Sequence, residues 1–307
     1  MRLAILHSRV KLAAKRSNAR RHSILIEKVV STRTVDLIVL PSYPFTGPLI
    51  GYYPPSKARL KLRELAEKIS EKNIPAGPSV SFMARWSQEY GVYILGGPII
   101  ERAGPRVYVT TVLTAPDGSI AGKYRKVSLT EEERDMGISP GKEPGIFKLK
   151  VNGSEISLGV FSDEDLATPE IFRHLQLGGS KMIIGTIFPY NSGFLGGIID
   201  DDGLVTMDHN VVKTFLEVRS RETGVPIILV GSIIDSGVET LAYMSTIPVE
   251  PDEGVIEDKM FGPDDESPIF IDLNEKATNP RKPPEHLNIL VKSLCRNNSR
   301  RGGNKAF

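Results

Sequence analysis

The 307-residue sequence has a single cysteine, Cys295, and only five histidines. One cysteine cannot build a disulfide framework, and the scattered histidines show none of the ligand spacings of metal sites. No run of about eighteen apolar residues occurs, so no membrane-spanning helix is predicted. The N-terminus opens on an alternating apolar run and not on a signal peptide. We therefore expect a cytoplasmic protein without a cofactor, a metal ion or a membrane contact.

The composition and the periodicity of the chain favour one large domain in which helices and strands alternate. Forty per cent of the residues are hydrophobic, enough for a large core, and the net charge of +2 indicates no class of partner. Within residues 56–72, Leu62, Leu65 and Ile69 have amphipathic helical spacing. Helices are predicted at 12–30, 56–72, 78–89, 169–177 and 208–223. Strands are predicted at 2–7, 36–40, 92–97, 107–113, 156–161, 181–187, 227–232 and 241–245.

The most informative segment is residues 158–170, which read LGVFSDEDLATPE. This segment resembles the nucleophile turn of the nitrilase (carbon–nitrogen hydrolase) superfamily, Gly-Val-x-x-Cys-Tyr-Asp-x-x-Phe-Pro-Glu. The pairs Gly159-Val160 and Pro169-Glu170 fit that pattern without a gap. The resemblance therefore places Asp163 where the family has its nucleophilic cysteine.

Other segments resemble the same superfamily in the same order. Residues 36–47, DLIVLPSYPFTG, are similar to a block that ends Leu-Pro-Glu-x-x-x-Thr-Gly, with Ser42 in place of the general base. Residues 117–126, DGSIAGKYRK, place Lys126 at the catalytic lysine, and Glu133 falls at a second, substrate-positioning glutamate. The resemblance extends from residue 2 to about residue 273. It implies a four-layer α-β-β-α sandwich with two mixed sheets.

The resemblance also implies which chemistry has been lost. In the family, glutamate takes the thiol proton, the thiolate attacks an amide or nitrile carbon, and lysine stabilises the oxyanion. A member that lacks both the cysteine and the first glutamate is catalytically inactive by that route, because removing the nucleophile of such a set costs on the order of 10⁶ in turnover. The remnant site comprises Ser42, Lys126, Glu133 and Asp163. We expect Asp163 and Lys126 to form a partly buried salt bridge; the alternative is that both lie in a solvated depression.

Several other polar features have simpler interpretations. The acidic residues 200–202 precede a glycine and are predicted to form a turn, not a metal site. The run 131–133 is typical of a solvated face, and only Glu133 has the alternative of facing the pocket. No histidine motif supports Ser162 as a substitute nucleophile, and we expect its side chain to point away from the pocket.

The C-terminal region has a different composition. We assign residues 1–275 to the nitrilase-like domain and residues 276–307 to a basic extension that possibly crosses a dimer interface. An apolar stripe in a predicted helix carries Leu287, Leu290, Val291 and Leu294. Basic side chains that could contact nucleic acid or an acidic partner are Arg296, Arg300, Arg301 and Lys305. A solvated end is the alternative.

Three functional hypotheses follow. The leading one is an inactive nitrilase-fold protein that acts as an interaction or scaffold module, as a homo-oligomer and possibly with a protein partner. The second is a binding protein in which Lys126 and Glu133 hold a small carboxylate or amide. The third is a hydrolase of altered chemistry in which Asp163 acts as general base toward water. A weaker alternative is RNA or acidic-partner binding through the tail.

Overall fold

The computed structural model describes residues 1–71, 74–188, 197–199, 205–256, 260–262 and 264–273, with only the backbone at 71, 197–199 and 205–207. The helices are α1 (Lys15–Thr32), α2 (Pro55–Leu65), α3 (Pro78–Tyr90), α4 (Glu131–Asp135), α5 (Pro169–Leu177) and α6 (His209–Thr223), with a 3-10 turn η1 at Asp163–Ala167. The strands are β1 (Arg2–His7), β2 (Arg9–Lys11), β3 (Leu37–Ser42), β4 (Ser70–Glu71), β5 (Ile74–Pro75), β6 (Tyr93–Ala103), β7 (Arg106–Thr114), β8 (Ile120–Arg125), β9 (Gly145–Val151), β10 (Ser154–Ser162), β11 (Met182–Thr186), β12 (Gly197–Ile199), β13 (Val205–Met207), β14 (Ile227–Val230), β15 (Ser232–Asp235), β16 (Thr240–Met244), β17 (Ile247–Glu250), β18 (Gly254–Val255) and β19 (Ser267–Asp272).

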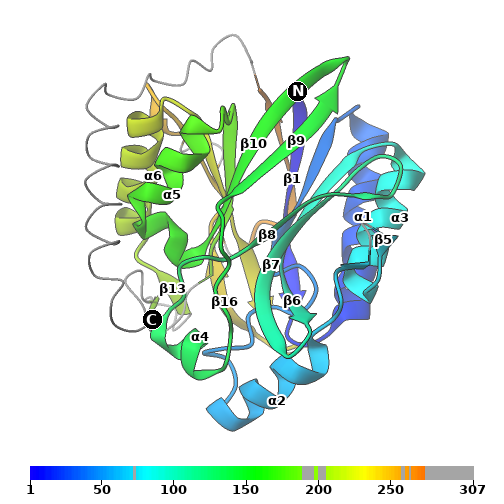
Figure 1. Cartoon of the computed structure of the whole chain (residues 1–307), viewed down its shortest axis with the longest axis vertical. Coiled ribbons are helices and arrows are strands. Elements are labelled where there is room, and N and C mark those ends of the chain that lie inside the picture. The colour runs from blue at the N-terminus through cyan, green and yellow to red at the C-terminus, as the bar shows by residue number, and fades with distance from the viewer. Residues whose placement is uncertain (72–73, 189–196, 200–204, 257–259, 263, 274–307) are drawn as a thin grey trace, which may run out of the picture.

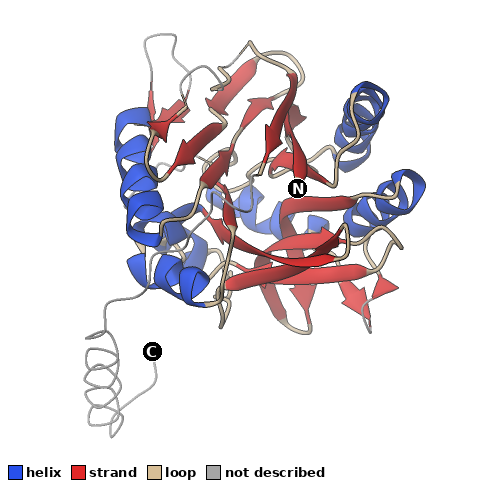
Figure 2. Cartoon of the chain, turned by 90° about the horizontal axis from the view of Figure 1, so that it is seen from above, coloured by secondary structure: helices blue, strands red, loops and turns tan. Residues whose placement is uncertain are grey.

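Two six-stranded sheets lie face to face, with helices on the outer sides (Figures 1 and 2). Their strand orders are β19-β1-β3-β6-β7-β8 and β18-β17-β14-β11-β10-β9. Both are mixed: β1 is parallel to β3 and antiparallel to β19, and β10 is parallel to β11 and antiparallel to β9. Helices α1 and α3 cover the first sheet, and α5 and α6 cover the second. The expected α-β-β-α sandwich is confirmed. A five-stranded sheet, β12-β13-β16-β15-β2, was not expected.

Alternation along the strands explains the layers. In β1, Leu3 and Ile5 point between the two sheets, whereas Ala4 and Leu6 point toward the helices. Because successive strand side chains face opposite ways, one buried strand supplies two cores. Strand neighbours in the inter-sheet core include Leu37, Val39, Leu158, Val160, Met182, Ile184, Ile228 and Val230.

The prediction of a helix over 56–72 is wrong in its second half. Helix α2 ends at Leu65, and Ala66 already has an extended backbone. The Glu67 amide then donates to the carbonyl of Ile100 at 3.0 Å, so the segment runs beside β6. Ile69, which belongs to this extended segment, is buried. Hydrogen bonds to the part of β6 beyond its pairing with β3 outweigh the helical periodicity that this stretch also carries.

The predicted strand 227–232 is divided at Gly231. A Cβ atom at Gly231 would lie 1.8 Å from the carbonyl oxygen of Met244, so only glycine fits this close approach. The carbonyl of Gly231 accepts a hydrogen bond from the amide of Ser42 at 3.1 Å. The break between β14 and β15 therefore ties the second sheet to the end of β3.

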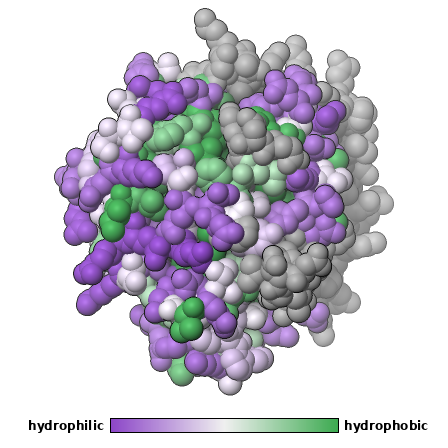
Figure 3. All heavy atoms as spheres, turned by 180° about the vertical axis from the view of Figure 1, so that it is seen from behind, coloured by the Kyte–Doolittle hydropathy of each residue, from purple (hydrophilic) through white to green (hydrophobic). Residues whose placement is uncertain are grey.

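The surface is mainly polar. Figure 3 shows hydrophilic residues over much of one face, with apolar patches between them. Ile24, Leu60 and Val238 are among the exposed large apolar side chains. In the described part of the chain, no helix has the length and apolar character needed to cross a membrane. The acidic residues 200–202, the boundary at 275, the apolar stripe of the extension and its four basic residues all lie outside the described residues.

Candidate functional site

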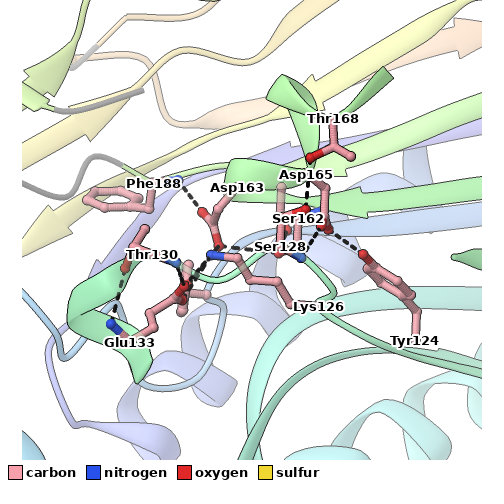
Figure 4. A network of polar contacts seen from close by, with 12 residues as sticks. Tyr124, Lys126, Ser128, Thr130, Glu133, Ser162, Asp163, Asp165, Thr168 and Phe188 are labelled. Atoms are coloured by element: carbon pink, nitrogen blue, oxygen red, sulfur yellow. Dashed lines mark hydrogen bonds and ion pairs between the residues drawn. The ribbon is translucent and has the colours of Figure 1, made fainter. Parts of the chain in front are cut away.

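Three charged side chains from separate segments meet at one end of the sandwich (Figure 4). Lys126 follows β8, Glu133 lies in α4, and Asp163 follows β10 directly. The Lys126 Nζ is 2.9 Å from both Glu133 carboxylate oxygens and 3.2 Å from Asp163 Oδ2. Their side chains are 0 %, 0 % and 2 % exposed, respectively. We name this group the Lys126 centre. The expected Asp163–Lys126 salt bridge is present, and it is fully rather than partly buried, because Glu133 supplies the second partner that such burial requires.

The turn that carries Asp163 has a strained backbone. Asp163 has a φ of 47°, a left-handed conformation that aspartate tolerates better than most residues because its short polar side chain can bond locally. The Asp165 carboxylate closes the turn by accepting from the Ser162 amide at 2.9 Å. Strain at a buried polar residue is typical of functional sites.

Besides Lys126 and a longer contact from Ser162, two groups donate to the Asp163 carboxylate. The Tyr43 hydroxyl donates to Oδ2 at 3.0 Å, and the Phe188 backbone N–H donates to Oδ1 at 2.9 Å. The Tyr43 and Phe188 rings pack edge to face with centroids 6.4 Å apart. Sequence analysis missed both residues. Tyr43 adjoins the expected Ser42, but nothing in the sequence marks Phe188, which acts through its backbone.

Glu133 is held in place by the start of its own helix. The Thr130 hydroxyl accepts from the Glu133 amide at 3.1 Å, while the Glu133 carboxylate accepts from the Thr130 amide at 2.9 Å. This is a capping box, whose Thr-x-x-Glu signature was available in the sequence. Glu133 is buried and Glu131 is exposed, so the solvated-face interpretation holds for Glu131 and fails for Glu133.

The balance of charge shifts the pKa values within the centre. Burial by itself would lower the pKa of Lys126, but the Asp163 and Glu133 carboxylates outweigh it and raise that pKa. Burial raises the pKa of Glu133, opposed by Lys126 and supported by repulsion from Asp163. Lys126 is therefore a permanent cation at neutral pH.

A third buried carboxylate, that of Asp165, lies beside the centre. Asp165 accepts from the Tyr124 hydroxyl and, at 2.8 Å, from the amide of Ser128. Burial raises the pKa of Asp165, opposed by the hydrogen bond from Tyr124. Its polar contacts within the described residues come from neutral donors, and they join β8 and the turn after it to the Asp163 turn.

Ser42 and Ser162 lie in different surroundings. Ser42 is buried at the end of β3, and among the described residues its hydroxyl has no hydrogen-bond partner. Ser162 was expected to point away from the pocket. Its hydroxyl lies 3.2 Å from that of Thr186 and 3.4 Å from Asp163 Oδ2, so it touches the centre at its margin.

The arrangement offers a fixed cation, carboxylates and neutral hydrogen-bond donors. Cys295, the chain's one cysteine, is outside the described residues. Within the described ranges, no group of three or more His, Cys, Asp or Glu side chains has an arrangement suited to a metal ion. In the described centre the cation is already paired with two carboxylates, and the centre holds no thiol.

The carbon-nitrogen hydrolase family model matches residues 2–234. The chain belongs to this family. Among curated carbon-nitrogen hydrolase relatives, the omega-amidase NIT2 of Homo sapiens is 29 % identical over 128 residues, 42 % of this chain and 40 % of that protein. The Xenopus tropicalis omega-amidase NIT2 is 30 % identical over 179 residues, 55 % and 57 % of the two chains. The chain thus spans about half the length of the curated relatives it matches.

Solved structures of carbon-nitrogen hydrolases share the fold. Saccharomyces cerevisiae Nit3, of branch 10 of the nitrilase superfamily, superposes with a TM-score of 0.68 at 19 % identity, covering 91 % of each chain. An amidase from Nesterenkonia sp. AN1, with acrylamide added to its active-site cysteine, superposes with a TM-score of 0.67 at 16 % identity, covering 97 % of this chain and 99 % of the amidase.

Proposed function

We propose that this chain is a catalytically inactive member of the carbon-nitrogen hydrolase family that acts as an interaction or scaffold module. The observation that carries the proposal is the identity of the residue on the strained turn. Asp163 stands there with its carboxylate bound to Lys126, and the chain's only cysteine is at position 295. The amidase from Nesterenkonia, by contrast, has an active-site cysteine.

The contacts of the Lys126 centre support inactivity in two ways. A carboxylate is a weak nucleophile toward an amide because the anhydride it would form returns readily to reactants, and the hydrogen bonds that Asp163 accepts from Phe188, Tyr43 and Lys126 weaken it further. An oxyanion stabiliser must present its charge to the substrate, whereas the Lys126 ammonium already faces two carboxylates. Ser42, at the position of the general base, has a hydroxyl that does not accept a proton at neutral pH.

The test is ammonia release from a panel of amides that includes ω-amides, the class named by the matched relatives. The full-length wild-type protein is compared with Asp163→Ala at equal concentration. We expect both to remain at the background rate of buffer. Wild-type turnover that Asp163→Ala removes would contradict inactivity and support the general-base hypothesis.

The strained backbone at Asp163 gives that alternative a specific basis. A positive φ at a buried carboxylate costs folding free energy, and such strain is often retained where a side chain is used. As a general base, Asp163 would take a proton from water as the water attacks a reactive carbon–nitrogen substrate. Asp163→Asn keeps the shape but not the basicity, so it separates this role from one in packing.

Oligomerisation and the tail belong to the same proposal. We expect a homo-oligomer in the cytoplasm, with residues 276–307 crossing to a second subunit. Light scattering on the full chain and on a version ending at residue 275 tests this, and loss of the oligomer on truncation is the expected result. Gel-shift assays with RNA on the same pair test whether Arg296, Arg300, Arg301 and Lys305 bind nucleic acid. Equal shifts for both versions would exclude the tail.

A further inference from the structure

The donors around Asp163 are held in place by contacts that do not involve Asp163. Two 2.9 Å contacts to Glu133 fix the Lys126 ammonium, and its backbone is tied to Val109 and Gly141 at 2.9 and 2.7 Å. Phe188 packs against the Tyr43 ring. These donors would remain in position if the Asp163 side chain were absent.

The geometry of these donors is that of a receptor for one carboxylate. One oxygen of Asp163 accepts from the Phe188 N–H, and the other accepts from Tyr43 and Lys126, at 2.9 to 3.2 Å. The Ser162 hydroxyl adds a longer contact to the second oxygen at 3.4 Å. A backbone N–H, a hydroxyl and an ammonium that converge on a planar anion form a preorganised anion site. We name these three donors the anion cradle.

We propose that the Asp163 carboxylate is an internal ligand of the anion cradle, and that the cradle is a binding site for a small monocarboxylate once this side chain is removed. The inference concerns the site of the proposed function and rests on it. In the wild-type protein the cradle is filled from within the chain. A ligand carboxylate must therefore displace Asp163 to reach Lys126.

Charge and shape both favour this assignment. Among the described residues, Glu133 stays within hydrogen-bond distance of Lys126 when the Asp163 side chain is removed, and an added carboxylate restores the charge that Asp163 supplied. The side chain that Asp163→Gly removes corresponds in its heavy atoms to acetate. Glycine also adopts the φ of 47° at this position without the cost that a side chain imposes.

The experiment is thermal unfolding of the full-length Asp163→Gly variant in sodium acetate, in sodium chloride of equal ionic strength, and in acetamide. For so small a ligand we expect a Kd on the order of 1 mM. About 100 mM acetate should then raise the Tm by roughly 2–5 °C over chloride. Acetamide, which has the same shape and no charge, should give no comparable shift. A folded variant that responds equally to all three solutes, or to none, overturns the proposal.

Two matched controls sharpen the result. Wild-type protein and Asp163→Asn both keep the cradle filled, so neither should respond specifically to acetate; a wild-type shift equal to that of Asp163→Gly overturns the proposal. Asp163→Ala should respond in the same way to formate, which replaces the carboxylate alone.

If neither cavity variant folds in buffer, the refolding yield from urea is measured in acetate or formate against chloride. A carboxylate-dependent yield supports the internal ligand, and equal yields overturn it. The outcome is separable from the proposed function. Ammonia release by the wild type refutes inactivity whatever the cavity variants bind, and a variant that ignores carboxylates refutes the internal ligand whatever the wild type hydrolyses.

Discussion

Two ionic clusters start from adjacent residues of the chain and have opposite composition. At the Lys126 centre, one ammonium faces two carboxylates, and Lys126 and Glu133 are 0 % exposed. In the Glu101 cluster, defined as Glu101, Lys123 and Arg125, one buried carboxylate faces two cations that are each 30 % exposed. Arg125 contacts Glu101 through two 2.8 Å hydrogen bonds.

The difference teaches what burial does to a charge pair. Water can replace a lost partner at Lys123 or Arg125, because both side chains reach the surface, and salt screens what remains. The Lys126 side chain is 0 % exposed, so every member of that centre depends on the others. The Glu101 cluster joins β6 to β8, whereas the Lys126 centre joins the segment after β8, helix α4 and the turn after β10.

The largest effect should come from removing the central cation. Lys126→Met leaves two buried carboxylates without a counter-charge and should lower the free energy of unfolding by about 3–5 kcal/mol. Urea unfolding followed by the fluorescence of Trp86, the only tryptophan, measures this. The matched change Lys123→Met in the Glu101 cluster should cost at most about 1 kcal/mol. Equal losses would remove the distinction between the two clusters.

Two buried histidines also change the free energy of unfolding in the acid range, and this contribution must be separated from that of the two clusters. Burial lowers the pKa of both His7 and His22 from 6.5 to about 4, so the unfolded chain binds more protons between those values. The free energy of unfolding has its full value above pH 6.5. It falls as the pH drops toward 4, by up to about 3 kcal/mol per histidine. His22→Gln should flatten that limb when the free energy of unfolding is measured against pH. An unchanged slope would show that His22 ionises normally in the folded state.

Glu133 and Glu101 should contribute slopes of opposite sign to the dependence of the unfolding free energy on pH. Burial raises the pKa of Glu133 above 4.5, so the folded state holds the proton longer and its contribution to stability falls as the pH rises through the folded-state value. Burial opposes the ionisation of Glu101, but hydrogen bonds from Arg125, Thr110 and Lys123 lower its pKa, so its contribution is lost on acidification below 4.5. Differences between wild type and Glu133→Gln or Glu101→Gln measure each slope. Slopes of the same sign would contradict the assignment.

The smallest expected effect is that of salt. Raising NaCl from about 0.1 M to 1 M shortens the Debye length from about 10 Å to about 3 Å. The cost of Lys123→Met should shrink under that change by a few tenths of a kcal/mol, whereas the cost of Lys126→Met should stay the same. A salt-sensitive Lys126 centre would mean that solvent reaches it.

The family, the layered fold and one salt bridge were predictable from the sequence. The fold followed from the family resemblance that the ordered motifs carry, and the Asp163–Lys126 pair followed from motif positions. The end of α2 at Leu65 did not, because the helical spacing continues to Ile69 while the competing hydrogen bonds come from β6, distant in sequence. Phe188 was not predictable, because a backbone donor leaves no mark on residue type.

The sequence carries a local signal for the direction of the Glu133 side chain. Thr130 and Glu133 form a capping box in the sequence, which fixes the direction of that carboxylate before any tertiary contact is known. By contrast, the depth of burial of the Lys126 centre depends on Tyr43, α4 and the segment at Phe188 closing together. Composition and spacing carry no information on that closure.

The central claim is that Asp163 and Ser42, on an otherwise intact carbon-nitrogen hydrolase fold, account for inactivity. The most direct measurement is ammonia release from the ω-amide panel by wild type and by Ser42→Glu/Asp163→Cys, side by side. The account predicts a wild type at background and a double variant at least about tenfold above it, because the double variant again has a base, a thiol and a lysine. Wild-type turnover equal to or above that of the double variant would contradict it.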